Sequence, residues 1–173
     1  LALNYLKTVG QEAAAIKKID RPEIGKSFAG FAAYLLALNG ALDQAAFKEI
    51  YQTINDMTRE GSLLTLLAAK ITGYLPEAEL ISAAKPLLEK RWTMGKSGDY
   101  YFYARYREPA IALIAANILF PRDPITGNLA NELLGGVNKE GIWTSTSDTG
   151  WSLVALGDYF KGAAFTDKPV KVS

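Results

Sequence analysis

The amino-acid sequence predicts an all-α fold. Apolar residues recur with the 3.6-residue period of an amphipathic helix along most of the chain, whereas the alternation typical of a half-buried strand is almost absent. Glycine, proline and asparagine interrupt these periodic segments at short intervals, as expected for helices joined by short loops. Helix, short loop and helix, repeated to about eight helices without a sheet, indicates stacked αα-hairpins.

Four helices are expected in the first half of the chain. They cover residues 1–9, with an alternative in which the first helix continues to residue 19, then 22–39, 43–55 and 58–73. Gly10 is the expected end of the first helix. Gly40 and Gly73 are expected to end the second and fourth, because glycine readily adopts the left-handed conformation that stops a helix. Asp43 has the side chain and the position of an N-cap for the third.

Four more helices are expected in the second half, over residues 76–92, 105–119, 124–135 and about 146–162. Pro86 lies inside the first of these and should kink or split it. Residues 93–99 contain two glycines and are expected to form a loop, and Pro121 should stop the helix that precedes it. The tail 166–173 alternates valine with lysine and is expected to be a linker or the start of a strand.

A chain of 173 residues can close one hydrophobic core, so we expect a single helical domain over residues 1–163. Residues 164–173 are then a linker or the start of a following β segment. A closed α/α toroid needs about a dozen helices arranged in hairpins. The chain supplies fewer, and the predicted architecture is therefore a partial α/α toroid.

Composition excludes several classes of function. Nineteen basic residues against eighteen acidic ones give a formal charge of +1, which favours neither nucleic acid nor an anionic membrane as a partner. Histidine and cysteine are both missing, which excludes Ser-His and Cys-His nucleophile pairs and the usual zinc sites within these residues. We expect no cofactor, no metal and no direct membrane insertion, since no apolar run has the roughly 18 residues of a membrane span.

The segment 140–160 carries the most informative pattern. Ser145, followed three residues later by Asp148, has the spacing of a capping box, in which each side chain accepts a hydrogen bond from a backbone N–H at the helix start. This spacing predicts a helix that begins near residue 146. The residues that follow leave almost no polar face, so we expect a helix enclosed by other helices, with Trp143 and Trp151 in the core.

These motifs resemble the helical domain of the alpha-2-macroglobulin and complement family. The last hairpin of that domain has a Gly-aromatic-Ser-Thr-x-Asp-Thr segment, matched here by Gly141, Trp143, Ser145, Thr146, Asp148 and Thr149. Residues 28–90 are similar to the succession of Ala- and Leu-rich helices in the bacterial branch, and residues 100–120 to its aromatic segment. Two departures stand out: Tyr103-Ala104 replaces a usual Gly-Ser, and Arg107-Glu108 replaces Arg-Asp.

The resemblance covers about residues 28–163 and implies the C-terminal part of a terpenoid-cyclase-like α/α toroid in a bacterial protease trap. Such a protein is an endopeptidase inhibitor of the periplasm or cell envelope, which collapses around a protease that has cut its bait region. The implied partners are other domains of the same large chain and the captured proteases. The thioester of some members needs a cysteine and would lie upstream. The segment itself is expected not to be an enzyme, and its first residue, Leu1, suits a piece of a longer protein.

Aromatic and basic residues cluster before the helix expected over 105–119. In the family, the corresponding segment lies on the face that meets neighbouring domains. The candidate inter-domain contact residues are therefore Tyr101, Tyr103, Arg105, Tyr106 and Arg107. Packing within the core is the alternative for these aromatic side chains, since large aromatics commonly anchor cores.

Two other functions remain open on the sequence. A glycosidase needs a pair of carboxylates, and Asp99, Glu108 and Asp148 all lie near tyrosine or tryptophan residues. The main alternative is therefore a fragment of an α/α-toroid carbohydrate-active enzyme, a glycosidase or lyase, with Asp99 or Glu108 as acid or base. For Asp148 the cap is the preferred role. A helical-repeat scaffold is the third interpretation, and the Asp-rich motifs of terpene cyclases are missing from the sequence.

Overall fold

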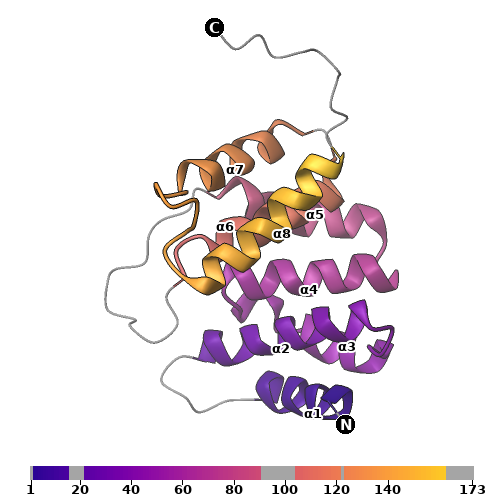
Figure 1. Ribbon diagram of the computed structural model, residues 1–173. Helices are drawn as coiled ribbons and strands as arrows, with labels where there is room; N and C mark the ends of the chain where they lie inside the picture. Colours follow the sequence, from indigo (N-terminus) through magenta and orange to yellow (C-terminus); the bar gives the residue numbers. More distant parts are fainter. Residues whose placement is uncertain (1, 16–21, 91–103, 122, 163–173) are drawn as a thin grey trace, which may run out of the picture.

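The structure, a computed structural model, describes residues 2–15, 22–90, 104–121 and 123–162 (Figure 1). Its helices are α1 (Ala2–Ala15), α2 (Pro22–Leu38), α3 (Gln44–Tyr51), the short 3₁₀ helix η1 (Ile54–Asp56), α4 (Arg59–Thr72), α5 (Glu77–Glu89), α6 (Arg107–Leu119), α7 (Pro124–Gly135) and α8 (Thr146–Gly162). No strand occurs in the described residues, so the all-α prediction is confirmed there. The expected loop 93–99 and the tail 164–173 lie outside them.

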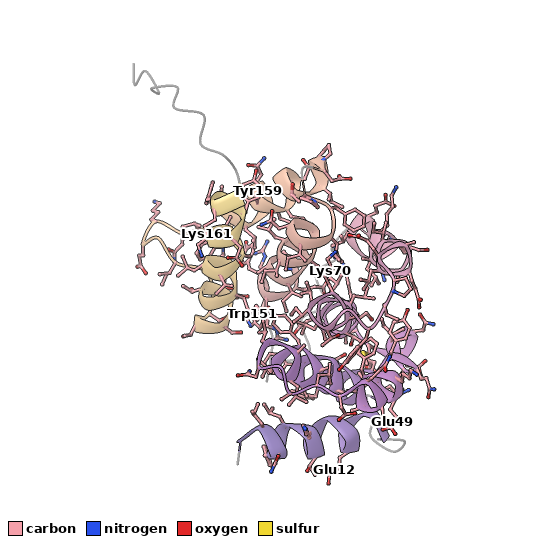
Figure 2. The ribbon with its side chains drawn as sticks, turned by 90° about the vertical axis from the view of Figure 1, so that its right-hand side faces the viewer. Glu12, Glu49, Lys70, Trp151, Tyr159 and Lys161 are labelled. Carbon is pink, nitrogen blue, oxygen red and sulfur yellow. The ribbon has the colours of Figure 1, made fainter. Side chains whose placement is uncertain are left out.

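Consecutive helices form αα-hairpins, and α2, α4, α6 and α8 begin at the same end of the molecule (Figure 1). The most extensive contacts join α2 with α4, α1 with α2, and α6 with α8. Helices α3, α5 and α7 run back toward this end and connect the other four helices. Helix α8 lies against α6, and near its beginning Trp151 also reaches α2 (Figure 2).

Local signals in the sequence account for most helix ends. Gly40 and Gly73 have positive φ angles of 63° and 71°, as a left-handed stop requires. Asp43 caps α3, because its Oδ1 accepts a hydrogen bond from the Ala46 N–H at 2.8 Å. Thr58 caps α4 in the same way, through the N–H of Gly61. The predicted roles of Gly40, Gly73 and Asp43 are confirmed.

The first and third helices end elsewhere than the sequence suggested. Helix α1 continues through Gly10 to Ala15, so the expected stop at Gly10 is wrong and the longer alternative is closer. Helix α3 ends at Tyr51 and not near Asn55, and the chain then tightens into η1. In both places a single polar or small residue was too weak a signal to set the boundary.

We expected a kink or a split at Pro86; helix α5 is continuous through this residue, so it is not split there. The buried residues Leu80, Ala84 and Leu88 lie on both sides of the proline. Their packing stabilises the helix across the one hydrogen bond that proline cannot donate. The helix ends at Glu89, short of the expected residue 92.

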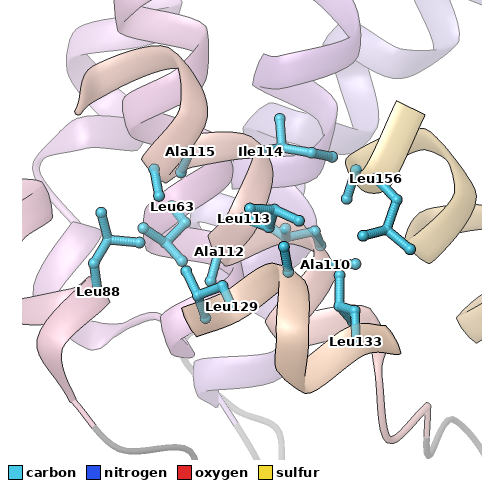
Figure 3. Packing of buried hydrophobic residues seen from close by; sticks show 14 of the residues in the cluster. Leu63, Leu88, Ala110, Ala112, Leu113, Ile114, Ala115, Leu129, Leu133 and Leu156 are labelled. Carbon is cyan, nitrogen blue, oxygen red and sulfur yellow. The ribbon is translucent and has the colours of Figure 1, made fainter. Parts of the chain in front are cut away.

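Two hydrophobic clusters form the core, and α4 contributes to both. Leu63 and Leu67 belong to the cluster formed with α6, α7 and α8, and Leu66 and Ala69 to the cluster formed with α2 and α3. Figure 3 shows the first of these clusters. Residues 61–69 of α4 and 109–116 of α6 are buried on every side, so these two helices are the ones enclosed by others.

The expectation that the last helix is fully enclosed is wrong. In α8, Ala155 and Leu156 are buried, but Leu153 and Val154 are 59% and 54% exposed. An apolar composition predicts that a helix has much surface to bury, but it does not say on how many sides neighbours are present. Here α8 lies at the edge of the described helices, with one apolar face exposed.

Helices α2 and α4 approach each other so closely that only glycine fits at two facing positions. A Cβ atom added at Gly30 would lie 2.4 Å from the Gly61 carbonyl oxygen. A Cβ atom added at Gly61 would lie 2.7 Å from the Cα of Ser27. Because both obstructions are backbone atoms, the helices would have to move apart to accept a side chain.

Gly30→Ala should therefore destabilise the protein by about 1–3 kcal/mol or more, through separation of α2 and α4. The measurement is the free energy of unfolding in denaturant. Gly157→Ala is the matched control, since Gly157 is also inside a helix but a Cβ there meets nothing within 4 Å. The control should be neutral or stabilising, by up to about 1 kcal/mol. Equal effects of the two substitutions would contradict the close contact.

Candidate functional site

The residues singled out in the sequence meet where α4, α6 and α8 begin. We call this region the helix-start cluster and define it as residues 58–60, 106–108 and 143–149. Hydrogen bonds and ion pairs connect each of its three parts to the next. The start of α2 adjoins it, because the Ser27 Oγ accepts a hydrogen bond from the Thr58 N–H at 2.9 Å.

A tight loop before α8 aims Trp143 into the core. The side chain of Asn138 accepts hydrogen bonds from the N–H groups of Glu140 and Ile142, and Gly141 has a φ of 79°. Trp143 is 5% exposed and its Nε1–H donates to the Leu133 carbonyl at 2.8 Å. The loop therefore fixes α8 to the end of α7 through one buried indole.

Helix α8 begins at the predicted place. The Ser145 Oγ accepts a hydrogen bond from the Asp148 N–H at 3.0 Å, as an N-cap does. The return hydrogen bond of a capping box does not form, however. Instead the Oδ1 atom of the Asp148 carboxylate faces the start of α6.

Asp148 is fully buried and caps a different helix. Its Oδ1 accepts hydrogen bonds from the backbone N–H groups of Tyr106 at 2.6 Å and Arg107 at 3.0 Å, and its Oδ2 accepts one from the Thr144 hydroxyl at 2.5 Å. Tyr106 has no side-chain cap of its own. The carboxylate thus satisfies two N–H groups that every helix start leaves without an intrahelical partner.

A signal for this arrangement was present in the sequence. Pro109 lies in the first turn of α6, where its missing N–H costs nothing, and the N-cap residue before it is a tyrosine, which is a poor cap. Such a helix start needs an acceptor from elsewhere in the chain. Periodicity alone could not identify Asp148 as that acceptor, because it lies 42 residues after Tyr106.

Two reciprocal ion pairs join α4 and α6. Arg59 donates to the Glu108 carboxylate at 3.1 Å, and Arg107 donates through Nε to Glu60 at 3.0 Å. The same Arg-Glu dipeptide begins both helices, so each arginine meets the other helix's glutamate. The Arg59 side chain is only 8% exposed, and loss of its partner would leave a buried charge uncompensated.

Burial raises the pKa of Glu60 above its ordinary value. Arg107 lowers this pKa by its charge and hydrogen bond, and the nearby Glu108 carboxylate raises it further. Desolvation outweighs the ion pair here, which is common for charges held inside a protein. The glutamate therefore favours the folded state more when it is protonated than when it is ionised.

Three of the candidate inter-domain residues make contacts within the chain. The Arg107 guanidinium pairs with Glu60, and the Arg105 guanidinium lies 5.3 Å from the centre of the Tyr106 ring. The Tyr106 ring lies against Gly136, where a Cβ atom would approach it to 2.3 Å. Arg107 thus pairs with a carboxylate of its own chain. Tyr101 and Tyr103 lie outside the described residues.

The two tryptophans of the signature have different surroundings. Trp143 is buried, whereas Trp151 is half-buried and contacts the edge of Phe31 on α2, with ring centres 6.4 Å apart. Figure 2 shows Trp151 near the beginning of α8, at the side facing α2. Trp151 therefore lies at the margin of the core.

The carboxylates considered for catalysis are engaged in structural contacts. Glu108 is paired with Arg59, and Asp148 has no exposed surface and accepts three hydrogen bonds. Asp99 lies outside the described residues. Within those residues, no group of three or more aspartate or glutamate side chains is placed to hold a metal ion. None of the helices described is both long and apolar enough to cross a membrane.

Comparisons of the chain with protein-family models, with curated proteins and with solved structures found no match.

Asp148→Asn should destabilise the protein by about 1–3 kcal/mol, because the amide oxygen can still accept from the two backbone N–H groups but the negative charge that strengthens these hydrogen bonds at a helix start is lost. Asp158→Asn on the same helix is the control, since the Asp158 side chain is 50% exposed. That substitution should change stability by no more than about 0.5 kcal/mol. Denaturant unfolding of both variants is the measurement. If Asp148→Asn were as mild as the control, the negative charge of Asp148 would not be needed to hold α6 and α8 together.

Glu60→Gln should change stability in a pH-dependent way. Below the unfolded-state pKa both side chains are neutral, and the variant and the parent should be similar. As pH rises through the raised folded-state pKa of Glu60, the parent loses the stability that the protonated form contributed. The variant should gain stability relative to the parent as the pH rises above about 4.3, the ordinary pKa of glutamate. Unfolding free energies of the variant and the parent, measured at several pH values, test this sign. A variant that gained stability relative to the parent as the pH was lowered would contradict the prediction.

Trp143→Ala should cost about 3–5 kcal/mol, the usual cost of removing a buried large aromatic. Trp151→Ala should cost less, because that side chain is half-buried, and among the described residues its indole N–H has no hydrogen-bond partner corresponding to the Leu133 carbonyl that binds Trp143. Melting temperatures of the two variants provide the comparison. A larger loss for Trp151 would mean that its contact with α2 outweighs the buried indole.

Proposed function

We propose that this chain is the helical domain of a bacterial protease trap similar to alpha-2-macroglobulin, and that it acts as a structural element and not as a catalyst. One observation carries the proposal: five of the six residues matched to the last hairpin of the family's domain build the connection between α6 and α8 and the loop before α8. Gly141 turns the loop, Trp143 anchors it, Ser145 caps α8, and Asp148 caps α6. Thr149 supports the loop by accepting a hydrogen bond from the Trp143 N–H at 3.3 Å.

These contacts suit a domain that moves as one body. Asp148 ties α8 to α6, and the reciprocal ion pairs tie α6 to α4. The glycine contact then ties α4 to α2. Short hydrogen bonds, ion pairs and close packing between successive helices together resist bending of one helix against the next. A rigid domain can transmit the collapse of a large protein around a captured protease without changing its own shape.

The proposal includes the α/α-toroid architecture. In it, α2, α4, α6 and α8 form the inner layer, and α3, α5 and α7 the outer layer, of a toroid to which further hairpins of a longer protein are added. Residues 1–163 are the partial toroid and 164–173 lead to the next segment. The partners are other domains of the same protein and the proteases it captures, in the periplasm or cell envelope.

The carbohydrate-active alternative receives little support from the arrangement of carboxylates. Hydrolysis of a glycosidic bond needs one carboxyl group that can donate a proton and a second that acts as base or nucleophile. Asp148 is inaccessible to a substrate, and the charge of Glu108 is held by Arg59. A structural role explains both residues and their burial.

A protein containing this domain should change shape on limited proteolysis and shield the captured protease from large substrates. Hydrolysis of casein should fall strongly, while hydrolysis of a short chromogenic peptide by the same protease should continue, because small molecules still reach the enclosed active site. The isolated chain should inhibit neither reaction, since the bait region lies elsewhere.

The control is a bait-region variant that the protease cannot cut, which should leave both activities unchanged. Equal loss of casein and peptide hydrolysis would indicate blockage of the protease active site and would exclude trapping. Polysaccharide cleavage by this chain, abolished by Glu108→Gln, would replace the proposal with the carbohydrate-active one.

A further inference from the structure

We draw no further inference here: the strongest candidate, the open cleft of about 810 Å³ between the end of α5 and the first half of α7, is lined by side chains of both charge signs, and nothing in the described part of the chain shows what would occupy it.

Discussion

The buried carboxylate of Asp148 is the interaction on which the helical arrangement most depends. A negative charge inside a protein is costly unless donors surround it, and here two backbone N–H groups and one hydroxyl do so. Both N–H groups belong to the first turn of α6, where the helix dipole also favours a negative charge. One side chain of α8 therefore provides the acceptor for two N–H groups at the start of α6. The packing of α8 on α6 follows from it.

The other contacts of the helix-start cluster connect α6 to α4, and α4 to α2. The reciprocal Arg-Glu pairs connect α6 to α4. Removing these charges from water costs free energy, and the same desolvation raises the pKa of Glu60. Partly buried ion pairs of this kind add little net stability, because desolvation offsets the attraction between the charges. Apolar packing of Leu63, Leu113 and their neighbours provides most of the driving force (Figure 3).

The sequence was informative where the cause was local and uninformative where it was not. Gly40, Asp43 and Ser145 act within a few residues of their position, so their roles could be predicted. The partner of Asp148 could not, because the capping-box spacing describes only its own helix. The exposed face of α8 was missed for a similar reason. Which side of an apolar helix remains open depends on the number of neighbouring helices, and that number is a property of the whole fold.

Amide hydrogen exchange at the start of α6 tests the central claim most directly. The first N–H groups of a helix normally exchange quickly because they have no intrahelical partner. If Asp148 caps α6, the amides of Tyr106 and Arg107 should be protected about as well as the interior amides of α6. The first amides of α5, which follows Pro76 without a side-chain cap, should exchange much faster. Rapid exchange of Tyr106 and Arg107 in the folded protein would contradict the account.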